Sequence, residues 1–136
     1  LQGALGAFSA QTNTIYLSDS LLSPSQSNQL TAVLLEEIGH YLDSRLNKVD
    51  TKGDEGELFS AIVRKIDLSP TELARIQTEN DQTQLVLDSK LLTVEQATEV
   101  TLPLTPVSFP KEVIPFAAGK IDFWAKLSGF SGPILW

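Results

Sequence analysis

Apolar residues recur at helical spacing over the segment from Gln29 to Leu46. A period of 3.6 residues brings such positions to one side of a helix, where they form a broad apolar face. That face would carry Leu30, Val33, Leu34, Ile38, Tyr41 and Leu42. Ser27 and Asn28 precede the segment, and both are residue types that cap helix N-termini. The pattern therefore predicts that the strongest helix of the chain covers residues 29–46.

Two shorter helices are predicted after a polar loop. The first starts at Asp54 and runs to about Lys65. The second is marked by Ser69-Pro-Thr-Glu72, a capping box with proline at the first helical position, and extends to about Thr78. The apolar residues expected on the inner sides of these helices are Leu58, Ala61, Ile62, Leu73 and Ile76.

The period of the apolar residues changes from 3.6 to 2 after Asn80-Asp81. Residues 84–87 and 91–94 flank Asp88-Ser89-Lys90, which predicts a hairpin. A short strand is also expected at residues 14–17, where β-branched and aromatic residues cluster. The expected fold class is α+β, with a short N-terminal strand or hairpin against three helices, then a β-hairpin and an extended arm.

Prolines punctuate the C-terminal part of the chain. Proline every few residues disfavours central strands and favours an extended arm. Both tryptophans and four of the six phenylalanines lie after residue 108, so this part is too apolar for a solvated linker. We therefore expect a domain over residues 1–97 and an extended apolar arm with a short terminal helix over residues 98–136. Residues 101–136 are expected to pack on the domain or to dock on a neighbouring chain.

Composition narrows the classes of function. The chain has 10 Lys+Arg against 17 Asp+Glu, a net charge of −7, and no basic run, which disfavours a nucleic-acid partner. No stretch approaches the roughly 18 to 20 consecutive apolar residues that a membrane-spanning helix needs. The absence of cysteine excludes disulfides and thiolate metal sites. Any metal chemistry must therefore use carboxylates, hydroxyls and the single histidine.

The acidic residues concentrate around that histidine, His40. The first 35 residues hold one charged residue, whereas residues 36–57 hold seven acids. On a helix, Glu36 and His40 are four positions apart and Glu37 and His40 are three apart, so one face offers two carboxylates and an imidazole. In the H-E-x-x-H zinc motif, two histidines at this spacing bind the metal and the intervening glutamate activates water. Here a glutamate stands in place of the first histidine.

A third metal ligand has to come from another part of the chain. Glu57 is the first candidate, because a glutamate one helix downstream completes the zinc site in one large class of these enzymes. It lies 17 positions beyond His40, with a turn between them. Asp54 and Glu55 are alternative ligands, and together with Asp50 they could form an oxygen-rich calcium site.

The same residues also have an interpretation that involves no metal ion. His40 could be a partly buried helix histidine that hydrogen-bonds to Glu36 or Glu37, and Glu57 could pair with the start of its own helix. Gly39 lowers helix propensity, which suggests that the edge strand or a substrate packs closely beside it.

Three segments together resemble a short zincin metallopeptidase domain. They are Asn-Thr-Ile-Tyr-Leu at 13–17, Val-Leu-Leu-Glu-Glu-Ile-Gly-His-Tyr-Leu-Asp at 33–43 and Gly-Asp-Glu-Gly-Glu-Leu-Phe-Ser at 53–60. More narrowly, residues 3–95 resemble a domain of large secreted cyanobacterial proteins with calcium-binding repeats. The resemblance implies that Glu36, His40 and Glu57 bind a divalent metal, zinc or calcium, and that Glu37 is the general base.

Two functions follow as expectations. The first is a zincin-derived extracellular or cell-surface module with a degenerate metal site, which serves assembly or interaction, including self-association, through residues 101–136. The second is a metal-dependent peptidase with Glu37 as the base. The replacement of the first motif histidine by Glu36 favours the first expectation.

Overall fold

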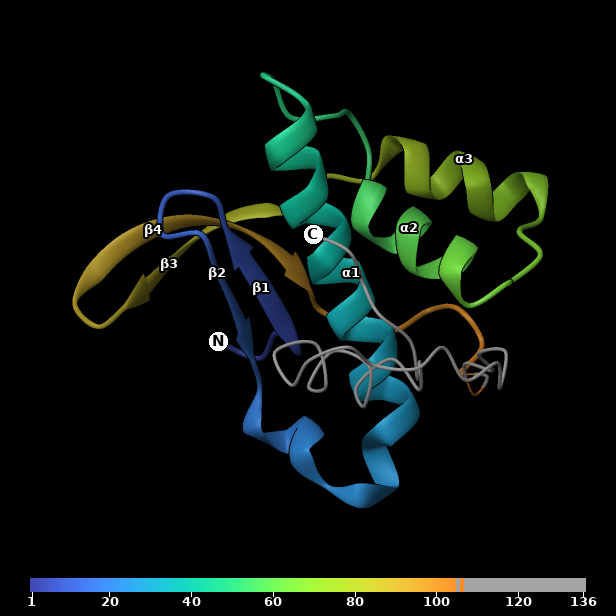
Figure 1. Cartoon of the computed structure of the whole chain (residues 1–136), viewed down its shortest axis with the longest axis horizontal. Coiled ribbons are helices and arrows are strands. Elements are labelled where there is room, and N and C mark those ends of the chain that lie inside the picture. The colour runs from blue at the N-terminus through green and yellow to red at the C-terminus, as the bar shows by residue number, and fades with distance from the viewer. Residues whose placement is uncertain (105, 107–136) are drawn as a thin grey trace, which may run out of the picture. The chain divides into compact units, whose positions relative to one another are not determined.

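The computed structural model describes residues 1–104 and 106. The chain divides into two units, Leu1–Pro106 and Val107–Trp136, and the first contains all the described elements. In chain order these are β1 (Gly6–Ser9), β2 (Thr14–Leu17), the short 3-10 turns η1 (Asp19–Leu22) and η2 (Pro24–Gln26), α1 (Ser27–Leu46), α2 (Glu55–Val63), α3 (Pro70–Thr78), β3 (Gln82–Leu87) and β4 (Lys90–Ala97). The expected α+β class with three helices is confirmed (Figure 1). Most of the expected C-terminal arm, including its short helix, lies outside the described residues.

The four strands form one antiparallel sheet in the order β2-β1-β4-β3. β1 is a central strand, in which Phe8 is opposite Ile15 of β2 on one side and Glu95 of β4 on the other. The sequence predicts β2 but not β1, because Gly-Ala-Phe-Ser contains one residue with high strand propensity. Pairing with two neighbours, rather than local preference, makes these four residues a strand.

The predicted hairpin of β3 and β4 is confirmed. Its turn residues Asp88 and Ser89 have φ angles of 48° and 62°, the left-handed geometry of a two-residue turn that matches strand twist. The strands are longer than predicted, since β3 begins at Gln82 and β4 ends at Ala97. The last three residues of β4 are the ones that pair with β1.

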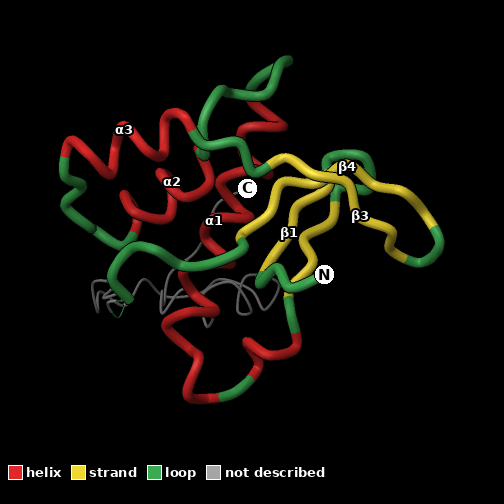
Figure 2. Tube along the Cα trace, turned by 180° about the vertical axis from the view of Figure 1, so that it is seen from behind, coloured by secondary structure: helices red, strands yellow, loops and turns green. Residues whose placement is uncertain are grey.

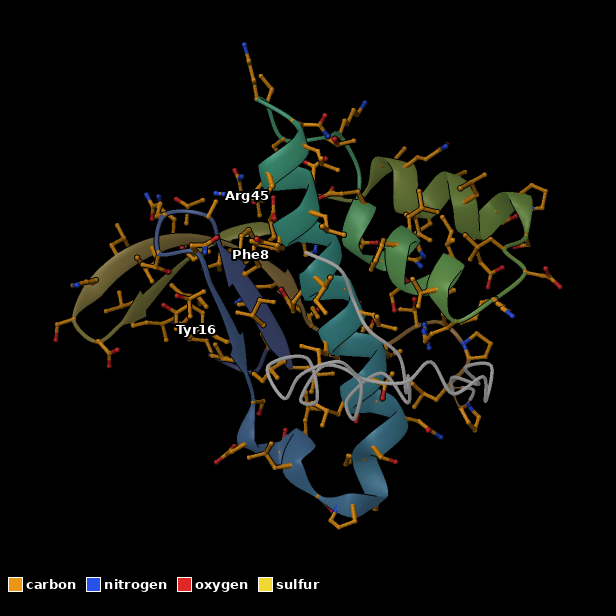
Figure 3. All side chains as sticks on the ribbon, viewed as in Figure 1. Phe8, Tyr16 and Arg45 are labelled. Atoms are coloured by element: carbon orange, nitrogen blue, oxygen red, sulfur yellow. The ribbon has the colours of Figure 1, made fainter. Side chains whose placement is uncertain are left out.

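α1 lies between the sheet on one side and the α2–α3 pair on the other, as Figures 1 and 2 show from opposite sides. Phe8 points from β1 toward α1 (Figure 3), and its ring meets that of Tyr41 edge-on with the centroids 6.0 Å apart. Gly6 permits a very close approach of strand and helix, since a Cβ there would lie 2.6 Å from Val33 Cγ1. The face of α1 that carries the histidine is therefore enclosed by both layers.

The helix boundaries agree with the sequence to within two residues. α1 begins at Ser27 with Gln26 at the cap position, whereas the sequence placed the cap at Ser27 or Asn28. α3 has the predicted capping box, in which Ser69 Oγ accepts from the Glu72 amide at 3.2 Å and Glu72 Oε2 accepts from the Ser69 amide at 2.8 Å. Within the described part of the chain, no helix combines the length and the apolar character needed to cross a membrane.

α1 and α2 cross at a pair of glycines. A Cβ on Gly39 would lie 2.7 Å from the Cα of Gly56, and Ser60 Oγ donates to the Ala32 carbonyl at 2.9 Å. The close neighbour that the sequence indicates at Gly39 is thus α2, not the edge strand or a substrate. This contact brings the start of α2 against the middle of α1.

The first residues after β4 pack on α2 and α3. Leu102 is buried in an apolar cluster with Ala61 and Ile76. Arg64 Nη1, from the end of α2, donates to the Pro103 carbonyl at 3.0 Å. Ile62 is 66% exposed, so its predicted burial is wrong. The helical period shows which residues share a face of α2, but not which face other elements cover.

Candidate metal centre

Glu36 and His40 lie on the buried face of α1, one helical turn apart. Glu36 is 5% exposed and His40 is 1% exposed. A spacing of four residues places them on the same side of the helix, and that side meets α2. A carboxylate and an imidazole from the predicted motif are therefore held together away from solvent.

The imidazole of His40 has carboxylates on both of its nitrogens. On one side, Nδ1 lies 2.9 Å from Glu55 Oε1, at the start of α2, and 3.4 Å from Glu95 Oε2, on β4. A carboxylate accepts, so the hydrogen bond to Glu55 places a proton on Nδ1. In the neutral ring the lone pair is then on Nε2. This is the arrangement in which an acidic partner orients a metal-binding histidine.

The other nitrogen, Nε2, faces two more carboxylates. Asp81 Oδ2 lies 3.1 Å away and Asp54 Oδ1 lies 3.8 Å away. Neither Nε2 nor Asp81 Oδ2 has a hydrogen-bond partner, although both are buried. Gly56 borders the same place, and a Cβ there would collide with Nε2 and lie 2.6 Å from the Glu36 carbonyl oxygen. In the neutral ring, the lone pair of His40 Nε2 therefore points into an acidic site that a larger residue at position 56 would fill.

One group of possible ligands in this site combines both helices. Glu36, His40 and Asp54 each offer an atom within 4.8 Å of the other two. Asp54 caps α2 through Oδ1, which accepts from the Glu57 amide at 2.6 Å, and it is 4% exposed. The residue that lies with Glu36 and His40 is therefore Asp54, an alternative ligand in the sequence analysis, and not Glu57, its first candidate.

Glu57 belongs to a different cluster. Its Oε1 accepts from Arg75 Nη2 at 2.8 Å and from Thr101 Oγ1 at 2.7 Å. Glu57 is grouped with Asp54 and Glu79, and not with Glu36 and His40. The Glu57 side chain thus joins α2 to α3 and to the segment after β4. It does not cap its own helix as a reciprocal capping box would, since it bonds elsewhere.

Glu37, the expected general base, faces the sheet. It is 0% exposed, its Oε1 accepts from the Ala97 amide at 3.3 Å, and its Oε2 has no partner. A Cβ on Gly6 would lie 2.5 Å from Oε1, so the carboxyl group sits directly on β1. Burial raises the pKa of Glu37 to about 8, although His40 and the Ala97 amide act in the opposite direction. A carboxyl with this pKa is largely protonated at pH 7.

The other carboxyls of the site also hold protons more tightly than usual. Burial, with Asp54 and Glu37 nearby, raises the pKa of Glu36 well above its ordinary value. Burial likewise raises the pKa of Asp54 to about 7 and that of Glu95 to about 8, against the influence of His40. Crowding out of water disfavours the ionised form of these carboxyls, and a bound cation would favour it.

The pKa of His40 moves in the direction that this acidic surrounding dictates. Burial alone would lower it, but the carboxylates of Asp81 and Glu55 raise it well above 6.5. A proton on Nε2 and a metal ion at Nε2 are therefore competing ways to balance the same negative charge.

A cavity of about 300 Å³ lies next to the carboxyl groups around His40, and Glu95 belongs to both. It lies between the end of α1, the β1–β2 turn and β4, and its wall includes the acids Asp43, Asp50 and Glu95. Asp50 and Glu55, which the sequence linked to calcium, are grouped here with Asp43. The carboxylate of Asp43 already accepts from Asn47, and from the amide and hydroxyl of Thr51. These contacts account for Asp43 without an ion.

Asp81 and Glu95 were not identified from the sequence. They lie 41 and 55 positions after His40 and come next to it through the packing of the sheet on α1. For Glu95 a partial signal was present, because alternation in β4 puts its side chain on the same face as that of Ala97, which is buried against Val33 of α1. Asp81 follows α3 without any comparable pattern.

Comparison of the chain with protein-family models, with curated proteins and with solved structures gave no match.

Proposed function

We propose that this domain is a zincin-like module that binds one divalent cation at Glu36, His40 and Asp54, and that the ion stabilises the fold. The observation that carries the proposal is the buried, unpartnered Nε2 of His40, which faces carboxylates while Nδ1 is held by Glu55. A dication there would satisfy the lone pair and replace the protons of the surrounding carboxyls.

The donor set favours zinc over calcium. Calcium takes six to eight oxygen ligands, whereas zinc accepts imidazole nitrogen together with carboxylate oxygen in a four-coordinate site. Glu36 and Asp54 would supply oxygen and His40 nitrogen, each from a side chain that packing already holds in place. When bound, the ion would supply positive charge and fix the angle between α1 and α2.

Burial supports a structural ion rather than a catalytic one. A catalytic zinc keeps one position open to water and substrate, but Glu36, His40 and Asp54 are each at most 5% exposed. The expected base Glu37 is turned to the Ala97 amide and carries a raised pKa. Hydrolysis of peptides is therefore not part of the proposal.

The expected role of the arm in assembly stays a prediction. Residues 105 and 107–136 lie outside the described residues, and only the beginning of the arm is placed on α2 and α3. An extracellular or cell-surface location likewise stays part of the same hypothesis.

Zinc titration of the whole chain tests the proposed function. After removal of metal with a chelator, calorimetry should show one zinc ion bound per chain, with a rise in the melting temperature. Glu36→Gln should weaken binding at least tenfold, and His40→Ala should abolish it. Glu99→Gln, which alters an exposed glutamate, is the matched control and should bind as the wild type does.

Two results would overturn the proposal. One is that neither zinc, manganese nor calcium binds in a stoichiometric amount to the folded chain. The other is that Glu36→Gln and His40→Ala, shown to be folded by circular dichroism, bind zinc as tightly as the control.

A further inference from the structure

Asp81 has a largely buried carboxylate, one oxygen of which is available to bind a cation. It precedes β3 directly, and its side chain is 10% exposed. Its backbone is fixed to the sheet, since the Asp81 carbonyl accepts from the Gln96 amide at 3.2 Å. Its Oδ2 has no hydrogen-bond partner. The hairpin thus delivers one oxygen to the site, while Glu36, His40 and Asp54 come from α1 and the start of α2.

The distance between Asp81 and His40 fits two ligands of one ion. Asp81 Oδ2 and His40 Nε2 lie 3.1 Å apart, and they attract each other as an ion pair only if His40 is protonated. Two atoms bound to a tetrahedral zinc at about 2.0 to 2.1 Å lie about 3.3 Å from each other. Both atoms are electron-pair donors once His40 carries its proton on Nδ1, so they would repel each other unless a proton or a cation lies between them.

We infer that Asp81, which already lies against His40 Nε2, turns toward the proposed cation when the ion binds and becomes its fourth ligand, so that the ion joins the sheet to the helices. The inference rests on the proposed function. Glu36 and His40 come from α1, Asp54 precedes α2, and Asp81 precedes β3. The ion would thus add a link between two layers that otherwise meet through apolar contacts, the Glu37–Ala97 hydrogen bond and the contact of Glu95 with His40.

A pair of hairpin variants tests this ligand. Asp81→Asn keeps the size of the side chain and removes its charge, and it should weaken zinc binding by tenfold or more. Asp88→Asn is the matched control, because Asp88 is exposed in the turn and its φ of 48° suits asparagine equally well. It should leave the affinity unchanged.

Two further readouts separate a ligand from a merely structural residue. In the wild type, zinc should slow hydrogen exchange of the β3 and β4 amides, and this protection should be lost in Asp81→Asn. Zinc should also raise the melting temperature less in Asp81→Asn than in Asp88→Asn. A structural role alone would instead lower the melting temperature of the metal-free and the zinc-bound protein by the same amount.

The outcomes distinguish the two ideas. If Asp81→Asn binds zinc like Asp88→Asn while Glu36→Gln binds it weakly, Asp81 is not a ligand and the proposed function stands. If the wild type binds no zinc, the proposed function and this inference both fail. Zinc binding without any protection of β3 and β4 would also overturn the inferred link between sheet and helices.

Discussion

Two buried glutamates, Glu57 in α2 and Glu36 in α1, are placed in opposite electrostatic surroundings. Glu57 is 8% exposed and receives Arg75 and Thr101 on the same oxygen. Glu36 is 5% exposed, and burial together with the carboxylates of Asp54 and Glu37 raises its pKa, opposed by His40. The chain balances the charge of Glu57 with its own arginine. Around Glu36 and His40 the acids outnumber the base, so protons or a cation must complete the balance.

The contacts of Glu57 and those of His40 also connect α2 to its neighbours in two different ways. The Glu57 cluster ties α2 to α3 and to the segment after β4 with hydrogen bonds that are complete in the structure. His40 instead lies among carboxyl groups from the residues before α2 and β3 and from β4, and their charge has no matching arginine or lysine in these contacts. We therefore expect the first to depend on its arginine alone and the second to depend on pH and metal.

The largest expected effect comes from Glu37, the most enclosed acid near His40. Its pKa of about 8 in the fold exceeds the ordinary 4.5, so the folded state keeps a proton that the unfolded chain loses. This raised pKa leaves stability intact below about pH 4.5 and lowers it progressively up to about pH 8. Glu37→Gln removes the ionisation, and in metal-free protein at pH 8.5 it should raise the free energy of unfolding by ~3–4 kcal/mol.

Urea unfolding at pH 5 and at pH 8.5 measures this effect. The gain from Glu37→Gln should be small at pH 5 and large at pH 8.5, whereas Glu99→Gln should show no such change. Parallel pH profiles for wild type and Glu37→Gln would mean that Glu37 ionises freely, and the acidic side of the comparison would lose its main support.

The second effect is the pH dependence of zinc affinity. Zinc must displace protons from groups whose pKa values are raised, among them Asp54 at about 7 and His40. Displacing one proton changes the affinity about tenfold per pH unit, so binding should strengthen roughly a hundredfold from pH 6 to pH 8. Calorimetry in buffers with different ionisation enthalpies should detect the released protons. Affinity that does not vary with pH would indicate a site that excludes His40 and Asp54.

A smaller effect on stability is expected where Arg75 balances the charge of Glu57. Arg75→Ala leaves the Glu57 carboxylate buried with Thr101 as its remaining partner, and should lower the free energy of unfolding by ~2 kcal/mol. Arg75 is about one-third exposed, which limits the loss. Arg45→Ala, at an exposed helix position, is the control. Adding Glu57→Gln to Arg75→Ala should restore part of the loss, and equal losses in Arg75→Ala and Arg45→Ala would contradict a buried pair.

The elements with local signals were predictable from the sequence. The capping residues at Ser69 and Glu72 gave α3, and alternation around Asp88-Ser89 gave the hairpin. β1 was missed because its strand conformation depends on pairing with β2 and β4 rather than on its own residues. The burial of Ile62 was mispredicted for a related reason. The helical period of apolar residues does not tell which face of α2 other elements cover.

The candidate site divides along the same line. The pairing of Glu36 with His40 follows from four residues of helix and needs no tertiary information. Asp81 and Glu95 reach His40 only when the sheet packs on α1, which no short pattern contains. The position of Glu57 away from Glu36 and His40 was also hidden in the sequence, because it depends on Arg75, a residue of another helix that donates to Glu57.

The smallest expected effect is the difference in zinc affinity between variants of Glu57 and Glu36. Glu57→Gln keeps an oxygen for Arg75 and Thr101, and because Glu57 is not grouped with Glu36 and His40, zinc affinity should stay within about twofold of the wild type. Glu36→Gln, an identical chemical change at a similarly buried glutamate, should lower it at least tenfold, ~1.4 kcal/mol. Calorimetry on both variants at pH 7.5 makes the comparison. If Glu57→Gln weakens zinc binding as much as Glu36→Gln, then Arg75 releases Glu57 when the ion binds, and the two clusters form a single site.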